Sequence, residues 1–177
     1  MEGPKNLKAS LKLFPLSFEL SYLPDGRLSR VSFALYLHPN RREILIEEEA
    51  LRSPVADFLA QLRAYLQGRI SYIDLPHHLN VRDFTRRVLC LLREIPPGKT
   101  LTYKELAGLL KCPEAVRAIA KALSSNPLPL LYPCHRIISK EGLGGFSQGK
   151  LLKWLLLYWE RTYKNFDIKN PSVNFLT

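Results

Sequence analysis

The segment from Asn126 to Ile137 constrains this chain most, because three prolines precede its Cys-His pair, the last of them directly. Each proline fixes its own φ, lacks an N–H donor and pushes the preceding residue towards extended geometry. These restrictions exclude a helix and predict that Cys134 lies on a rigid, extended support. A neighbouring imidazole raises the thiolate fraction of a cysteine, so Cys134 is a candidate nucleophile. The alternative is a buried structural cysteine beside a surface histidine.

The length and composition are those of a globular protein. The 177 residues, of which 46% are hydrophobic and 24% charged, can form one domain or two small ones. No apolar run approaches the roughly 20 residues that span a bilayer, and Met1–Lys5 lacks the apolar core of a signal peptide, so we expect no membrane partner and a cytoplasmic location. Cys90, Cys112 and Cys134 form no Cys-x-x-Cys pair, which indicates reduced thiols rather than disulfides or a zinc knuckle.

The net charge of +10 is concentrated in the second part of the chain. Residues 1–80 carry 10 lysines and arginines against 9 acidic residues, whereas residues 81–177 carry 16 against 7. A solubility surplus would not explain this segregation. A polyanion, and nucleic acid in particular, is the partner that such a distribution favours.

Residues 1–78 are expected to form a strand-rich α/β domain. Alternating apolar residues and a Pro24–Gly26 turn predict two strands, and a short apolar run predicts another. The predicted strands cover residues 18–22, 31–35 and 43–46. Ser53 is expected to cap a helix that has Pro54 at its first position and ends near Gly68.

Residues 79–165 are expected to form a mainly helical domain, followed by a tail over residues 166–177. Asp83 can cap a first helix, which Pro96-Pro97-Gly98 stops. Thr102-Tyr103-Lys104-Glu105 matches a capping box and predicts a short second helix that ends near Lys111. A third helix is expected from Pro113 to about Leu123.

The second and third of these helices are a candidate helix-turn-helix. On the third helix, four residues are expected to form one narrow apolar face: Val116, Ile119, Ala120 and Leu123. The opposite side is expected to show four others: Arg117, Ala118, Lys121 and Ala122. Small residues let a DNA backbone come close, and the cations attract it. The alternative is an ordinary helical hairpin with a solvated charged face.

A glycine-rich loop, Gly142–Gly149, follows the Cys-His segment. It lacks the Gly-Lys-Ser/Thr ending of a Walker phosphate loop, so it predicts either a flexible hairpin or a pocket wall whose backbone approaches a ligand closely. A last helix from about Leu151 carries Glu160 towards its end.

Together these elements resemble the O6-alkylguanine-DNA alkyltransferases, also called methylated-DNA–protein-cysteine methyltransferases. The resemblance runs from about Phe84 to Glu160 and centres on the Pro-Cys-His-Arg-Ile segment. The residues that come in the family order are Tyr103, Arg117, Asn126, Cys134, His135 and Glu160. The Gly-Gly-Phe-Ser loop and the pattern of Lys153, Leu156, Leu157 and Glu160 also match, whereas residues 1–80 match only loosely.

The resemblance implies a DNA repair reaction without a cofactor, in which Cys134 accepts an alkyl group once and keeps it. His135 would take the thiol proton through a water, and Glu160 would orient the imidazole. Tyr103 would donate a hydrogen bond or proton to the guanine as the bond to O6 breaks. Asn126 would tie the recognition helix to the turn that carries the nucleophile.

The resemblance also implies duplex DNA carrying O6-alkylguanine as the partner, with the damaged nucleotide flipped out of the stack. Arg117 would fill the vacated stack from the minor groove, and Ala118, Lys121 and Tyr103 would contact the DNA. The residues expected around the flipped guanine are Pro133, Ile137, Phe146, Ser147 and Gln148.

Two residues depart from the family pattern. Tyr132 stands where an aliphatic residue is usual, which changes the packing behind the nucleophile. Gln148 stands where many members have glycine and is expected to narrow the pocket against bulky alkyl groups. Residues 1–80 contain no cysteine, so we expect no metal site of the kind some members carry there.

The overall expectation is therefore a monomeric α/β (α+β) protein with a strand-rich N-terminal domain and a winged helix-turn-helix C-terminal domain. One alternative is a non-catalytic winged-helix DNA binder, which would not need Cys134. The other is a cysteine hydrolase that uses Cys134, His135 and Glu160, which leaves Tyr103 and the basic helix-turn-helix unexplained.

Overall fold

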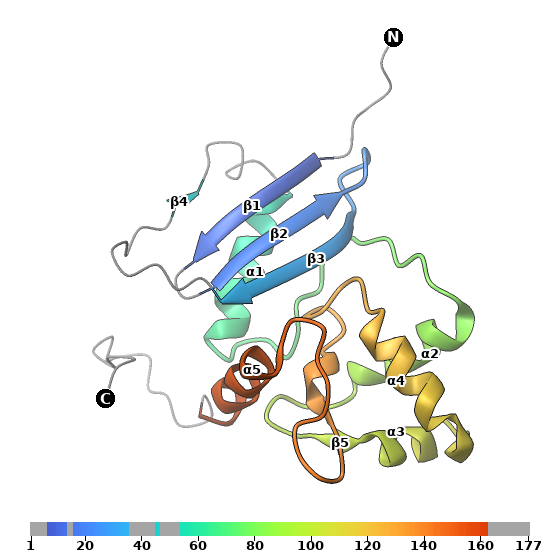
Figure 1. Ribbon diagram of the computed structural model, residues 1–177. Helices are drawn as coiled ribbons and strands as arrows, with labels where there is room; N and C mark the ends of the chain where they lie inside the picture. The colour runs from blue at the N-terminus through green and yellow to red at the C-terminus, as the bar shows by residue number, and fades with distance from the viewer. Residues whose placement is uncertain (1–6, 14–15, 36–44, 47–53, 163–177) are drawn as a thin grey trace.

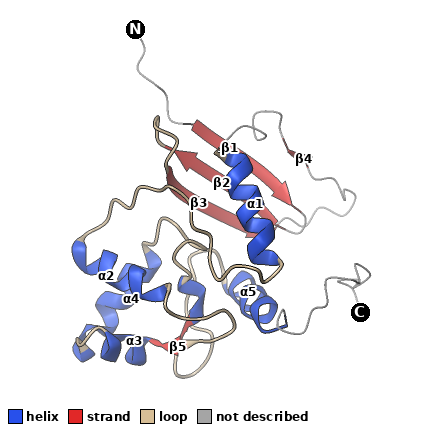
Figure 2. Cartoon of the chain, turned by 180° about the vertical axis from the view of Figure 1, so that it is seen from behind, coloured by secondary structure: helices blue, strands red, loops and turns tan. Residues whose placement is uncertain are grey.

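The computed structural model describes residues 7–13, 16–35, 45–46 and 54–162. Its N-terminal part is an antiparallel sheet in the order β3-β2-β1-β4, crossed on one face by helix α1 (Figures 1 and 2). The strands are β1 (Leu7–Leu13), β2 (Leu16–Tyr22), β3 (Leu28–Leu35) and β4 (Leu45–Ile46). The predicted strands 18–22 and 31–35 are confirmed as parts of β2 and β3. Strand β1 was not predicted, although its apolar residues Leu7, Ala9, Leu11 and Leu13 alternate with polar ones.

Helix α1 (Val55–Leu66) packs on the sheet through its apolar residues, and the rings of Phe58 and Phe18 meet edge to face. The predicted start of this helix is wrong by one residue. Pro54 occupies the cap position with φ of −99° and ψ of 2°, outside helical geometry, so the helix begins at Val55. Ser53 lies outside the described residues. Gly68, with a positive φ of 66°, follows the helix end as expected.

The C-terminal part consists of short helices around a two-stranded parallel ladder (Figure 1). The helices are α2 (Asp83–Leu92), α3 (Tyr103–Leu109), α4 (Val116–Ser124) and α5 (Lys150–Thr162), with single 3-10 turns at Pro113–Ala115 and Cys134–Arg136. Strands β5 (Leu101–Thr102) and β6 (Ile137–Ile138) form the ladder. Among the described residues, no helix is both long and apolar enough to cross a membrane.

The helix caps test the expectations made from local sequence. The capping box of α3 is confirmed, because Thr102 accepts the N–H of Glu105 and the Glu105 side chain accepts the N–H of Thr102. The expected cap of α2 is wrong. Arg82 holds the extended cap geometry and Asp83 is the first helical residue, where its carboxylate still favours the positive end of the helix dipole.

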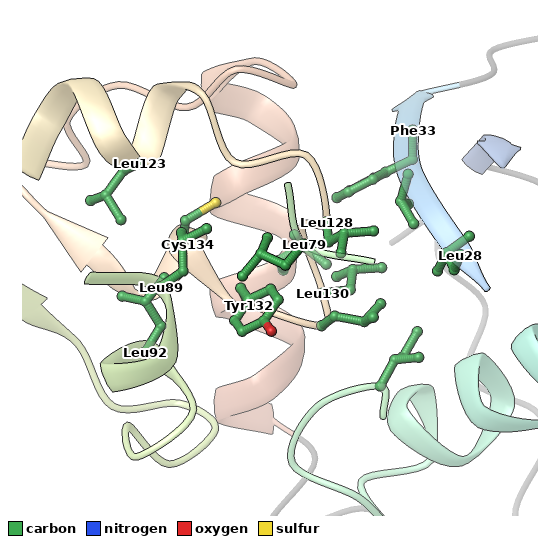
Figure 3. Packing of buried hydrophobic residues seen from close by; sticks show 14 of the residues in the cluster. Leu28, Phe33, Leu79, Leu89, Leu92, Leu123, Leu128, Leu130, Tyr132 and Cys134 are labelled. Atoms are coloured by element: carbon green, nitrogen blue, oxygen red, sulfur yellow. The ribbon is translucent and has the colours of Figure 1, made fainter. Parts of the chain in front are cut away.

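One buried core runs through both parts of the chain. Figure 3 shows Leu128 and Leu130 lying between Leu28 of β3 and the leucines of the helical part. Backbone hydrogen bonds cross in the same place, from the N–H of Val31 to the carbonyl of Pro127 at 2.9 Å and from the N–H of Ile73 to that of Leu130 at 3.2 Å. A boundary between domains at residues 78 and 79 therefore stays a prediction.

Candidate active site

Cys134 lies on a single 3-10 turn, so the prediction of an extended support is wrong. The turn covers Cys134–Arg136, and the N–H of Arg136 donates to the carbonyl of Pro133 at 3.1 Å. The physical reason is the reach of proline, which restricts itself and the residue before it but not the residues after it. The last proline, Pro133, therefore leaves the following turn free to form. Cys134 itself is buried, with 5% of its surface exposed.

Asn126 joins the end of α4 to this turn. Its Nδ2 donates to the carbonyl of Tyr132 at 2.8 Å and to Sγ of Cys134 at 3.2 Å, and its Oδ1 accepts the N–H of Leu128 at 3.0 Å. Burial raises the pKa of the Cys134 thiol, while the Asn126 hydrogen bond and the charge of Lys153 act in the opposite direction. Both neighbours favour the thiolate over the thiol at this buried position.

His135 and Glu160 form a buried pair behind the cysteine. Nε2 of His135 lies 2.9 Å from Oε1 of Glu160, and neither side chain is more than 3% exposed. Burial lowers the pKa of His135, against the pull of the carboxylate. Burial would raise the pKa of Glu160, but hydrogen bonds and charges from His135 and Arg136 outweigh it and hold that pKa well below its usual range. The pair is therefore a neutral imidazole on a charged carboxylate.

The second imidazole nitrogen is available for chemistry. Among the described residues, Nδ1 of His135 is the one buried side-chain nitrogen or oxygen without a hydrogen-bond partner. Because Glu160 can only accept, Nε2 of His135 carries the proton and Nδ1 carries a lone pair. A buried polar atom of this kind is commonly satisfied by water, so Nδ1 can serve as a base through one water molecule.

Two buried cations stiffen the surroundings. Arg136 is fully buried and donates to Glu160 and to the carbonyls of Ile95 and Ser71. Lys153 of α5 donates from Nζ to the carbonyls of Ile137 and Gly145, the latter at 3.0 Å. Burial lowers the pKa of Lys153 to about 8. Lys153 thereby ties the glycine-rich loop to the end of the turn Cys134–Arg136, the nucleophile turn.

Tyr103 is the first residue of α3 and lies beside the glycine-rich loop. A Cβ on Gly144, which has φ of 69°, would lie 3.4 Å from Cε2 of Tyr103 and 3.1 Å from the N of Ser139. Only glycine allows this approach without strain. Burial and the nearby Cys134 raise the pKa of Tyr103, so its phenol stays protonated as a donor. Phe146 places its ring edge-to-face against His135, with centroids 6.4 Å apart.

The expected pocket residues fall into two groups. Pro133 and Ile137 flank the nucleophile turn, both buried, and Phe146 covers His135. Ser147 is exposed. The side chain of Gln148 is hydrogen-bonded to the sheet, because its Oε1 accepts the N–H of Phe33 on β3 at 3.2 Å. This contact anchors the loop, a role that was not predicted for Gln148.

The outer face of α4 differs in one respect from the expected pattern. Arg117, Ala118 and Lys121 are exposed as predicted. Ala120 is exposed and Ala122 is buried, so the prediction exchanged these two alanines. The buried residues Ile119, Ala122 and Leu123 follow the spacing of three and four residues that one inward helix face requires. Ala120 therefore adds a further small residue to the exposed face.

Two residues that contact Glu160 were not predicted from the sequence. Tyr65 of α1 donates its hydroxyl to Oε1 at 2.7 Å, and Gly98 donates its N–H to Oε2 at 2.9 Å. Neither carries a local signal, because both contacts arise from packing of distant segments. Among the described residues, no group of three or more His, Cys, Asp or Glu side chains is placed to hold a metal ion.

The sequence of this chain is similar to those of known proteins. Residues 83–162 match the family described as 6-O-methylguanine DNA methyltransferase, DNA binding domain. The chain is 42% identical over 114 residues to a methylated-DNA–protein-cysteine methyltransferase of Metallosphaera sedula, covering 64% of this chain and 69% of that protein.

Two solved structures of proteins from Mycobacterium tuberculosis are also similar to this chain. The O6-methylguanine methyltransferase aligns with a TM-score of 0.72 at 26% identity, over 92% of this chain and 97% of that one. The OGT protein in complex with DNA aligns with a TM-score of 0.67 at 28% identity, over 83% and 88%. The sequence and the fold thus agree, and this chain belongs to the family of methylated-DNA–protein-cysteine methyltransferases.

Proposed function

We propose that this protein repairs double-stranded DNA by moving the alkyl group of O6-alkylguanine to Sγ of its own Cys134. The observation that carries the assignment is the buried thiol, which accepts a hydrogen bond from Asn126 at 3.2 Å beside a His135–Glu160 pair with a free Nδ1. An S–C bond forms as the C–O6 bond breaks. No cofactor is needed, because the substrate carbon is already activated by its guanine leaving group.

The proton balance assigns a role to each polar group. The Cys134 proton passes through a water to Nδ1 of His135, and Glu160 stabilises the imidazolium that forms. The Tyr103 phenol donates towards the guanine as negative charge develops there. A thioether has no good leaving group, so Cys134 remains alkylated and each molecule reacts once.

DNA binding is assigned to the exposed face of α4. Arg117 would enter the base stack at the place that the flipped nucleotide leaves. Lys121 would approach a phosphate, and the small side chain of Ala118 would let the DNA backbone come close. Pro133, Ile137, Phe146 and Ser147 would surround the guanine. We also propose that the protein acts as a monomer; a cytoplasmic location stays a prediction.

The test is stoichiometric transfer of label. The protein is incubated with duplex DNA that carries O6-methylguanine with a radiolabelled methyl group, and peptides are mapped by mass. We expect one methyl group per molecule, on Cys134 and on neither Cys90 nor Cys112. Label that stays on DNA would indicate a non-catalytic binder, and label released into solution would indicate a hydrolase.

A further inference from the structure

Tyr65 reaches the active site from the N-terminal part of the chain. It lies in the last turn of α1, is 5% exposed, and donates its hydroxyl to Oε1 of Glu160 at 2.7 Å across 95 positions of sequence. The same hydroxyl oxygen lies 3.5 Å from Nε2 of His135. Burial and the charge of Glu160 raise the pKa of Tyr65 well above its usual value, so this phenol is a donor at every working pH.

Tyr65 and His135 share one acceptor atom. Oε1 of Glu160 receives the Tyr65 hydroxyl, Nε2 of His135 at 2.9 Å and Nη2 of Arg136 at 2.7 Å, while Oε2 receives the N–H of Gly98. The carboxylate is thus held by donors from α1, the nucleophile turn and the loop before β5. Each added donor fixes the carboxylate and draws charge away from the imidazole.

The direction of the Tyr65 hydrogen bond also affects the imidazole. Because the phenol donates its only proton to Glu160, what it presents to Nε2 of His135 is a lone pair. Nε2 therefore faces two acceptors, the carboxylate and the phenol oxygen. Both favour the tautomer in which Nε2 carries the proton, and Nδ1 keeps the lone pair.

From this arrangement we infer that Tyr65 is a positioning residue of alkyl transfer, which holds Glu160 and keeps the His135 proton on Nε2 so that Nδ1 faces the Cys134 proton as a base. The inference rests on the proposed function and adds a residue from outside the matched family region, 83–162. It also gives the N-terminal part of the chain a place in the chemistry.

Within the part of the chain that the structure describes, the charged and titratable groups around His135 come from four elements. Helix α5 supplies Glu160 and Lys153, the nucleophile turn supplies Cys134 and Arg136, α1 supplies Tyr65, and α3 supplies Tyr103 beside Cys134. Arg136 and Lys153 oppose protonation of His135, and Glu160 favours it. Removal of the Tyr65 hydroxyl leaves these groups in place and frees charge on Oε1 to attract a proton to the imidazole.

The expected signature is therefore a shift along the pH axis. Transfer requires a neutral His135, so the rate falls as the pH drops through the pKa of this group. In Tyr65→Phe the pKa of His135 rises, so the acidic limb of the pH–rate profile moves to higher pH. We expect a shift of roughly one pH unit, which corresponds to the free energy of one hydrogen bond to a charged group. On the limb itself, the variant reacts about tenfold more slowly than the unmodified protein.

Tyr22→Phe is the matched control. Tyr22 is also a buried tyrosine of the N-terminal part, and its hydroxyl donates to a backbone carbonyl, that of Pro54, at 3.5 Å. Both variants lose one buried hydroxyl and keep the ring. The rate of Cys134 methylation by duplex DNA is measured for all three proteins from pH 5 to 9. A limb that moves in Tyr65→Phe alone supports the inference, whereas an unmoved limb, or equal shifts in both variants, overturns it.

A second measurement needs no reaction. The full chain is labelled with ¹⁵N in its four histidine rings, and the His135 signal is assigned by its loss in His135→Gln. In the unmodified protein we expect the proton on Nε2, and in Tyr65→Phe a titration at higher pH. A proton found on Nδ1 in the unmodified protein overturns the inference even where a variant does not fold.

Failure of this inference can be told from failure of the proposed function. If the unmodified protein is methylated on Cys134 and Tyr65→Phe titrates and reacts as Tyr22→Phe does, Tyr65 has only a packing role and the repair function stands. If the unmodified protein takes no label on Cys134, the repair function and the inference fall together.

Discussion

At the scale of the residue, the Glu160 carboxylate organises the site. It lies 5% exposed at the end of α5 and receives hydrogen bonds from Tyr65, Gly98, His135 and Arg136. A carboxylate with this many donors stays charged although it is buried. The same residue therefore links the chemistry of Cys134 to the stability of the whole chain.

Replacing Glu160 by Gln should change both the stability and its dependence on pH. At pH 7 we expect a loss of roughly 3–5 kcal/mol, because Arg136 is left as a buried charge without its partner. The folded pKa of Glu160 is depressed, so its contribution is complete above the unfolded value of about 4.3 and is lost as the pH falls below it. The wild-type protein should lose stability there more steeply than the variant.

Urea unfolding between pH 3 and 7 measures this difference. The exposed carboxylate of Glu114 gives the control, Glu114→Gln, which removes the same charge. Parallel pH profiles for wild-type protein and Glu160→Gln would contradict the account of Glu160.

Gly98 and Gly108 are two glycines whose replacement by alanine should change the stability in opposite directions. It has φ of 75°, and an added Cβ would lie 3.1 Å from the carbonyl oxygen of Glu160. Gly98→Ala should destabilise by about 1–3 kcal/mol, from left-handed strain and this contact with backbone. A Cβ added to Gly108 of α3 would meet no atom within 4 Å beyond its chain neighbours and the backbone of its own helix, so Gly108→Ala should stabilise by about 0.5–1 kcal/mol. Thermal unfolding of the two variants measures these changes. Melting temperatures that shift in the same direction in both variants would refute the distinction.

Residues were predictable to the extent that they belong to local motifs. Cys134 and His135 are adjacent in sequence, and Glu160 stands at a recognisable helical spacing from Lys153. Tyr65 and Gly98 have no such signal, because their contacts with Glu160 join segments 95 and 62 positions apart. Gln148 was placed correctly in the loop, but the partner of its side chain, Phe33, could be known only from the fold.

At the scale of the element, α3 and α4 show which features local sequence determines. The capping box of α3 depends on residues three apart and was predictable. The two faces of α4 were assigned correctly except at Ala120 and Ala122, because alanine has too little hydrophobic surface to mark a side by itself. The sequence therefore predicts the helix that carries Arg117 and Lys121 more reliably than it predicts which alanines of that helix face inward.

Helix α4 leads to a prediction about duplex DNA. If Arg117 replaces the flipped nucleotide in the stack, Arg117→Ala should slow repair of O6-methylguanine in duplex DNA by about tenfold to a hundredfold. The reaction with the free alkylated base should change little, because only the duplex requires flipping, which costs a few kcal/mol. Both rates are measured under single-turnover conditions.

The control for charge is Arg63→Ala, on the exposed side of α1. This change lowers the net charge equally but leaves α4 intact. Equal losses on both substrates in Arg117→Ala would assign Arg117 to the pocket or the fold and contradict its role in the stack.

At the scale of the whole molecule, the sheet meets the helical part at the segment that precedes Cys134 and at the glycine-rich loop. Phe33 of β3 packs its ring against Phe146 with centroids 6.3 Å apart, and Val31 donates its N–H to Pro127. The strands and helices were largely predictable from their periodicity, but this junction was not. Contacts between residues about 100 positions apart depend on topology, which a single sequence indicates only through family resemblance.

This junction leads to the last prediction, that methylation of Cys134 lowers the stability of the protein. The thiol is buried within the shared core and accepts the Asn126 hydrogen bond, so an added methyl group overpacks the site, typically at a cost of about 1–3 kcal/mol. For a chain of this size each kcal/mol lowers the melting temperature by about 2–4 °C. Thermal unfolding before and after reaction should therefore differ by several degrees, and Cys134→Ala treated with the same DNA should not change. An unchanged melting temperature of the methylated protein would refute close packing around Sγ while leaving single turnover intact.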